Sequence, residues 1–139
     1  RNYAKERGIA VIETVSSRER SYSNLISIQL HSSQQMEWIE GAVLRQGALR
    51  LVSLDGIPVE AHLGEHILLI RNQDTPGVIG QVGTILGKAK INIASFVLGK
   101  GQGHPHAVGI VNTDSSVPEE VLDKIREIPA VQFARVVQL

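Results

Sequence analysis

Apolar and polar residues alternate along the first half of the chain with the period of two that is typical of strands. The clearest case is the segment 25–30, where Ile26, Ile28 and Leu30 fall on one face and predict a half-buried strand. Taken with an apolar, β-branched run near the start, the pattern predicts strands over residues 9–15, 25–30, 37–44 and 49–54. This half is therefore expected to be mostly β.

The remaining elements of this half are a short helix, a loop and a hairpin. The helix covers residues 2–7 and ends at Gly8, and a polar loop fills residues 16–24. Asp55-Gly56 predicts a two-residue turn. The strand after that turn carries its apolar residues at period two, namely Val59, Ala61 and Leu63. Gly64-Glu65 then breaks the pattern, so we divide the chain into a first domain, 1–65, and a second, 66–139.

The second half alternates strands with stripes of apolar residues at helical spacing. The stripes are Val78, Ile79, Val82, Ile85, Leu86 and Ala89, and later Val121, Leu122, Ile125 and Ile128. The predicted strands are 66–70, 92–98, 107–112 and 131–139. The order βαββαβ is that of a ferredoxin-like fold, an antiparallel sheet with both helices on one face. The predicted class is α+β, with this domain preceded by the mostly β region.

Sequence signals also predict the ends of the two helices and an uncovered face of the sheet. Thr75 is expected to cap the first helix, with Pro76 at its first helical position. Ser116 and Glu119 have the spacing of a capping box, and Pro129 is expected to end the second helix. Such a sheet leaves one face bare, so pairing with another copy or another domain is expected.

Composition excludes several classes of function. The chain has 139 residues, a formal net charge of zero and no basic stripe, which argues against nucleic acid and anionic membranes as partners. No apolar run approaches the ~20 residues that span a bilayer. There is no cysteine, so disulfides and thiolate metal sites are excluded. We find no catalytic constellation, and the start on Arg1 without Met leads us to expect a fragment of a longer protein.

The start of the first helix is a candidate site for an amino acid. A helix N-terminus can hold a carboxylate, and Asp74, just outside it, can hold an ammonium group. We expect Asn72, Asp74 and Asn92 to surround one point, with the amides near Val78 and Ile79 binding the carboxylate. The alternative is that Asp74 only caps the helix and Asn92 only begins a strand.

Three other features carry weaker hypotheses. Gly80, Gly83 and Gly87 inside the helix predict close packing on the sheet or, less favoured, approach of a ligand or second subunit. His104 and His106, in the Gly-rich turn over residues 99–106, are too few for a convincing metal site. The basic residues of the first half are Arg45, Arg50 and His62. The last two are expected to face each other across the hairpin, either as an anion site or as solvated charges.

Residues 66–139 resemble an ACT domain, a regulatory module that senses amino acids. The segments that carry the resemblance are 74–80, 82–87 and 91–95. The chain as a whole is similar to the C-terminal part of the D-3-phosphoglycerate dehydrogenase family. Its first 65 residues resemble the later part of that family's intervening domain, also called the allosteric substrate-binding domain. Segments 4–9, 23–26 and 54–56 carry this resemblance of the first half, and segments 117–122 and 134–139 carry the similarity of the second half to the C-terminal end of that family.

The resemblance implies a cytoplasmic parent enzyme that oxidises 3-phosphoglycerate with NAD, a homodimer through paired ACT domains, and a tetrameric parent. Catalytic residues, NAD and metal are not expected in this chain. L-serine or a similar amino acid would bind at the ACT–ACT interface and inhibit. By position, Asp74 and Asn92 match serine-binding residues, with Asn92 coming from the partner subunit. The full set implied is Asn72, Asp74, Pro76, Gly77, Val78, Ile79, Asn92 and Ile93.

The resemblance also implies an anion site in the first half and leaves two alternatives open. Arg50 aligns with a basic residue that binds an anion in relatives, and His62 occupies a second such position. One alternative is the ACT region of an L-serine dehydratase, which also carries an intervening-like domain. The other is a purely structural module that holds an oligomer together and binds no effector.

Overall fold

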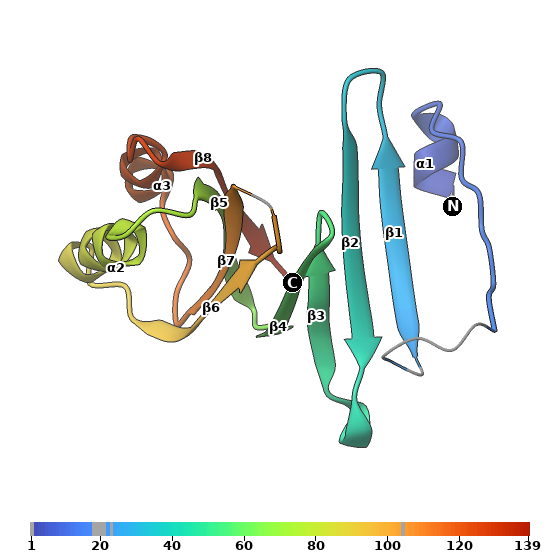
Figure 1. Cartoon of the computed structure of the whole chain (residues 1–139), viewed down its shortest axis with the longest axis horizontal. Helices are drawn as coiled ribbons and strands as arrows, with labels where there is room; N and C mark the ends of the chain where they lie inside the picture. Colours follow the sequence, from blue (N-terminus) through green and yellow to red (C-terminus); the bar gives the residue numbers. More distant parts are fainter. Residues whose placement is uncertain (1, 18–21, 23, 104) are drawn as a thin grey trace.

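The computed structural model describes residues 2–17, 22, 24–103 and 105–139, and they form two antiparallel four-stranded sheets (Figure 1). The first sheet has the order β1-β2-β3-β4, with β1 (Leu25–His31), β2 (Met36–Val43), β3 (Leu49–Leu54) and β4 (Ile57–His62). The second has the order β6-β7-β5-β8, with β5 (His66–Gln73), β6 (Ile93–Lys100), β7 (His106–Thr113) and β8 (Val131–Gln138). The helical elements are α1 (Asn2–Glu6), η1 (Arg45–Gly47), α2 (Val78–Lys88) and α3 (Glu119–Arg126).

The second sheet and its helices confirm the predicted α+β class and the βαββαβ order. Helices α2 and α3 lie side by side on one face of the sheet (Figure 1). The core between the helices and the sheet contains large side chains that are at most 1% exposed, among them Leu68, Ile70, Val82, Leu86 and Ile125. All four apolar residues predicted as the stripe of the second helix are buried. Helical spacing therefore identified the correct face of α3.

The predicted start of the first helix was wrong. Helix α2 begins at Val78, and its N-cap is Gly77, whose φ of 92° lies in the left-handed region that favours glycine. Thr75 and Pro76 instead belong to the turn before it, where the Thr75 amide donates to the Gln73 carbonyl at 2.8 Å. No side chain caps this helix. A tight glycine turn, rather than a capped proline start, joins β5 to α2.

The predicted limits of the second helix were also wrong. Its N-cap is Pro118, which offers no side-chain acceptor, so the capping box of Ser116 and Glu119 does not form. The Pro118 carbonyl already accepts from the amides of the first helical turn, which places the helix start two residues later than the box requires. The helix ends at Arg126, before Pro129.

The hairpin between β3 and β4 was predicted correctly. Asp55 and Gly56 have φ values of 50° and 78°, the left-handed pair of a type I′ turn. Buried and exposed residues alternate along β4, as the spacing of Val59 and Ala61 predicted, although Leu63 lies one residue beyond the strand. The buried side of β3 and β4 packs on the second sheet. This shared cluster is Leu51, Leu54, Ile57, Val59, Ala61, Ile67, Val108 and Ile110. The sheet face that was expected to be bare is thus covered within the chain.

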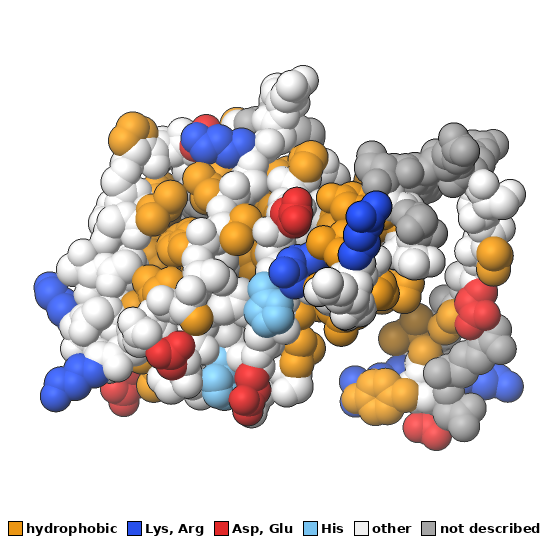
Figure 2. Space-filling view, turned by 90° about the horizontal axis from the view of Figure 1, so that it is seen from below, with side chains coloured by type: hydrophobic (Ala, Val, Ile, Leu, Met, Phe, Trp, Pro, Cys, Tyr) orange, Lys and Arg blue, Asp and Glu red, His pale blue; other side chains and the backbone are white. Residues whose placement is uncertain are grey.

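The start of the chain differs from the prediction. Residues 9–15 form no strand, and Ile12 and Val15 are 90% and 99% exposed. They lie with α1 at the side of the molecule (Figures 1 and 2). Strand β1 does form, but Ile26, Ile28 and Leu30 on its apolar face stay exposed, because they line open pockets between the two sheets instead of packing closely. Part of the predicted loop 16–24 (residues 18–21 and 23) lies outside the described residues.

None of the three helices in the described ranges combines the length and the apolar character needed to cross a membrane.

Candidate functional site

Asp74 lies directly after β5, at the approach to α2, and its carboxylate is already engaged. The Nζ atom of Lys100 lies 2.8 Å from the Asp74 Oδ1 atom. The exposed fractions of the two side chains are 56% for Lys100 and 41% for Asp74. Lys100 ends β6, and β7 lies between β6 and β5, so the lysine reaches across the start of β7. The Asp74 carboxylate is therefore already paired with the ammonium group of a lysine from the same chain.

The start of α2 supplies backbone donors close to Asp74 in the sequence. The first amide that donates within the helix is that of Gln81, to the Gly77 carbonyl at 3.0 Å. The amides before it, including those of Val78 and Ile79, have no acceptor inside the helix. Val78 is buried against the core, whereas Ile79 is exposed. An anion at this helix start would meet unused N–H groups and the positive end of the helix dipole.

Asn92 does not join this group within one chain. Asp74 lies beside the start of β7, where Gln73 pairs with His106, whereas Asn92 lies beside its end, where Ile93 pairs with Thr113. Strand β7 has eight residues, so at about 3.3 Å per residue the two sites are separated by roughly 20 Å. The expectation that Asp74 and Asn92 surround one point is wrong for a single chain, because α2 runs the length of the sheet between them.

The other polar candidates have partners of their own. The Asn92 Nδ2 group donates to Asp114 Oδ2 at 2.7 Å, and the Asp114 amide donates to the Asn92 carbonyl at 3.1 Å. Asn72 is buried, and its Nδ2 group donates to the adjacent Gln73 carbonyl at 2.7 Å. Ile93, next to Asn92, is half-buried. Asn72 thus presents little of its side chain to a ligand, whereas Asn92 is exposed.

The glycines of α2 do not pack on the sheet, so the favoured prediction was wrong. A Cβ atom added at Gly80, Gly83 or Gly87 would meet nothing within 4 Å. A glycine that is crowded by backbone is Gly99 on β6, where an added Cβ atom would lie 2.6 Å from the Pro58 carbonyl oxygen and closer still to the Val59 side chain. We missed Gly99 because the sequence placed it in a turn rather than in a strand.

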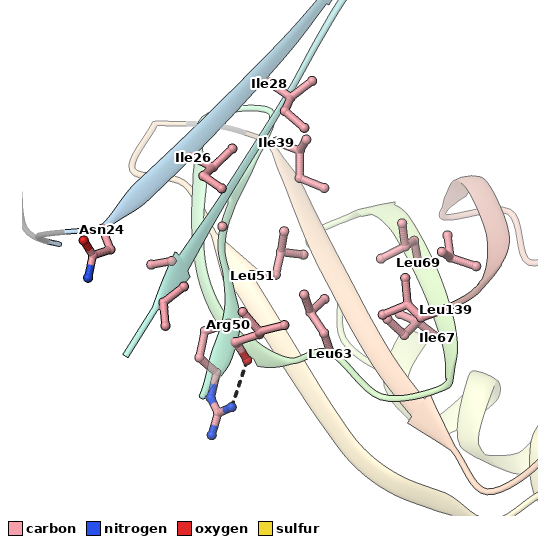
Figure 3. Close-up of a pocket in the computed structure, with 15 residues that line it drawn as sticks. Asn24, Ile26, Ile28, Ile39, Arg50, Leu51, Leu63, Ile67, Leu69 and Leu139 are labelled. Atoms are coloured by element: carbon pink, nitrogen blue, oxygen red, sulfur yellow. Dashed lines mark hydrogen bonds between the residues drawn. The ribbon is translucent and has the colours of Figure 1, made fainter. Parts of the chain in front are cut away.

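Arg50 and His62 face each other, as predicted, because they pair across β3 and β4. The Arg50 Nη1 atom lies 3.2 Å from His62 Nδ1 and donates to the Leu49 carbonyl at 3.0 Å. Arg50 stands at the edge of an apolar pocket of about 340 Å³ between the two sheets (Figure 3). Neither Asp74 nor Asn92 lines this pocket.

The described residues hold no group of three potential metal ligands. His104, one of the two histidines considered for a metal, lies outside the described residues. His106 lies in β7, with its Nδ1 atom 3.0 Å from Gln132 Nε2.

Asn112 is a buried polar residue that the sequence analysis did not identify. Its Oδ1 atom accepts from the Gly64 amide at 2.9 Å. Its Nδ2 group donates to the His62 carbonyl at 3.0 Å and to Ser95 Oγ at 2.9 Å. The Asn112 side chain therefore hydrogen-bonds the segment that joins the two sheets, at His62 and Gly64, to β7, an inner strand of the second sheet. The signal available was one polar residue within an apolar run, which alone does not reveal its partners.

A second tie joins the sheets at the β3–β4 hairpin. The Asp55 carboxylate forms an ion pair with Arg71 on β5 and accepts from the Trp38 amide at 2.9 Å. The Arg71 guanidinium also lies over the Phe133 ring, 5.2 Å from its centre. The two sheets are therefore joined by polar contacts as well as by the shared apolar cluster.

Comparison with known proteins relates both parts of the chain to one kind of enzyme. Residues 66–130 match the model of the ACT domain, and residues 1–55 match that of the D-3-phosphoglycerate dehydrogenase intervening domain. Proteins named D-3-phosphoglycerate dehydrogenase from Methanocaldococcus jannaschii, Synechocystis sp. and Bacillus subtilis are 37%, 31% and 29% identical over 98% of this chain.

The alignments cover 26%, 24% and 26% of those three relatives, so the chain spans about a quarter of their length. The match is to a region of the enzymes and not to their whole length. Within that region the order of the two domain matches agrees with the order of the two sheets. The chain therefore contains a region that matches the D-3-phosphoglycerate dehydrogenase intervening domain, followed by a region that matches the ACT domain.

Proposed function

We propose that this chain is the regulatory region of an NAD-dependent D-3-phosphoglycerate dehydrogenase and binds L-serine between the ACT domains of two copies. The observation that carries the proposal is the half-exposed Asp74 carboxylate beside a helix start with unused amides. A carboxylate next to amide donors matches the two charges of an amino acid. We place the boundary between the two domains at residues 64–65.

The arrangement assigns one role to each group. The serine ammonium binds the Asp74 carboxylate, and the serine carboxylate accepts from the amides of Val78 and Ile79. Pro76 and the left-handed Gly77 shape the turn that brings these amides next to Asp74. Asn72 supports the turn from inside rather than touching the ligand, because its side chain is buried.

A second copy is needed to complete this site. Helix α2 runs from the Asp74 end of the sheet to the Asn92 end, so two copies with antiparallel α2 helices would place Asn92 of the partner subunit near Asp74. The same two-fold pairing would form the site twice, with the partner's Ile93 beside each ligand. The open side of Gly80, Gly83 and Gly87 would let two such helices approach closely.

Serine bound in this way would act by stabilising the paired state. Its differential affinity for the paired arrangement restrains the parent's other domains and so lowers activity. The NAD-binding and catalytic residues belong to those domains. This chain has no Gly-x-Gly-x-x-Gly turn between a strand and a helix, so its own residues do not fit a dinucleotide. A cytoplasmic tetramer is the parent assembly that we propose.

Replacing Asp74 with lysine is expected to weaken L-serine binding by about 10- to 100-fold, the usual effect of losing a charged hydrogen bond. Calorimetric titration of the 139-residue chain with L-serine measures this, with glycine, L-alanine and D-serine as ligand controls. Glu120→Lys on α3 makes the same charge change at an exposed carboxylate to which the proposal gives no role, and should leave binding intact.

Two results would overturn the proposal. One is the absence of L-serine binding to a folded, dimeric chain, which would favour a purely structural oligomerisation module. The other is an Asp74→Lys variant that binds serine as tightly as the unmodified chain. Sedimentation of each variant, measured alongside, separates loss of binding from loss of the dimer.

A further inference from the structure

We infer that Lys100 is an internal competitor for the effector's ammonium group and thereby sets the affinity of the site. This inference rests on the proposed function. The Lys100 Nζ atom already occupies, at 2.8 Å from Asp74 Oδ1, the place that the ammonium of an amino acid would take. Both are primary ammonium groups with the same charge and the same donors. An amino acid can take the position at Asp74 Oδ1 only when Lys100 withdraws from it.

The structure fixes the place from which Lys100 reaches Asp74. The preceding residue, Gly99, is clamped between Val108 of β7 and the β4 segment of Pro58 and Val59, with no room even for a Cβ atom. Lys100 itself pairs with Ala107 on β7. The backbone that carries the lysine is thus held by the packing of the two sheets, and only the flexible side chain has to move.

Exposure makes this ion pair easy to displace. The Lys100 and Asp74 side chains are 56% and 41% exposed, so water can solvate both charges when they separate. Exposed pairs of this kind change an equilibrium constant by at most about fivefold. The lysine therefore lowers effector affinity by a few fold without closing the site. Once displaced, the lysine side chain extends into solvent beside the exposed residues that follow β6.

Calorimetric titration of the 139-residue chain with L-serine tests the inference on three variants. Lys100→Met removes the charge but keeps a long side chain, and we expect it to bind serine about two- to fivefold more tightly. Lys100→Arg keeps the charge and should bind like the unmodified chain. Lys124→Met removes the charge of an exposed lysine on α3 and should leave serine affinity unchanged.

Each outcome is decisive for one of the two proposals. Tighter binding by Lys100→Met alone supports competition. Unchanged or weaker binding overturns it and leaves serine binding itself intact; weaker binding would show that Lys100 holds the serine carboxylate instead. If neither the unmodified chain nor any variant binds serine, the proposed function fails and the competition fails with it.

Discussion

Replacing Gly99 with alanine is expected to lower the free energy of unfolding by about 2–3 kcal/mol. The new Cβ atom would lie 2.6 Å from the Pro58 carbonyl oxygen and closer still to Val59, while Val108 crowds it from the other side at 3.1 Å. The Pro58 contact is with backbone, which cannot rotate away. The two sheets must move apart at the place where β4 crosses β6, and urea unfolding measures the loss of stability.

A second glycine in the same half of the chain provides the control. Gly87→Ala introduces the same methyl group into α2, where no atom of the same chain lies within 4 Å, and should raise the stability of the unpaired chain by about 0.5–1 kcal/mol. Combining Gly99→Ala with Val59→Ala should recover only part of the loss, because the Pro58 carbonyl remains. Equal stability of the two single glycine variants would show that β4 does not press on β6.

Replacing Asn112 with leucine is expected to destabilise the chain by about 2–4 kcal/mol. The leucine keeps the number and branching of the side-chain heavy atoms but leaves the Gly64 amide and the His62 carbonyl without their partner inside the protein. Ser95 also loses its hydrogen bond to the amide. Urea unfolding measures the change in the free energy of unfolding. One pH is enough, because none of these groups titrates.

The matched control is the same substitution at an exposed asparagine. Asn92→Leu removes one hydrogen bond, to Asp114, at a place that water can reach, and should cost less than about 1 kcal/mol. A loss at Asn112 no larger than the loss at Asn92 would show that water or a local shift satisfies the Gly64 and His62 groups. The segment between the sheets would then be held by apolar packing alone.

Periodicity predicted the elements of this chain well because each strand or helix shows its buried face within a few residues. The alternation at Val59 and Ala61 and the stripe through Leu122 and Ile125 both correspond to buried positions. Periodicity failed at residues 9–15, since an apolar, β-branched run becomes a strand only when another strand accepts its hydrogen bonds. Capping preferences failed at Thr75 and Pro76, because the chain enters α2 through a left-handed turn at Gly77 and not through a side-chain cap.

The candidate site could be predicted only in part. Asp74 and the helix start are neighbours in the sequence, and their local chemistry was visible there. Asn92 follows the end of α2, and treating it as adjacent ignored the length of the helix between them. Lys100 reaches Asp74 across an intervening strand, a contact that depends on the strand order and that no local pattern contains.

The shared apolar cluster has a consequence for the order in which the chain is made. Strands β3 and β4 bury their side chains on Ile67, Val108 and Ile110, which a ribosome adds later. Strands β3 and β4 must therefore leave the ribosome before the surface that covers them exists. Strands β5 to β8 with α2 and α3 have a core of their own and do not depend on the first sheet in this way. The nascent chain thus passes through a stage in which apolar strands are exposed, the condition under which chaperone binding and premature strand pairing compete with folding.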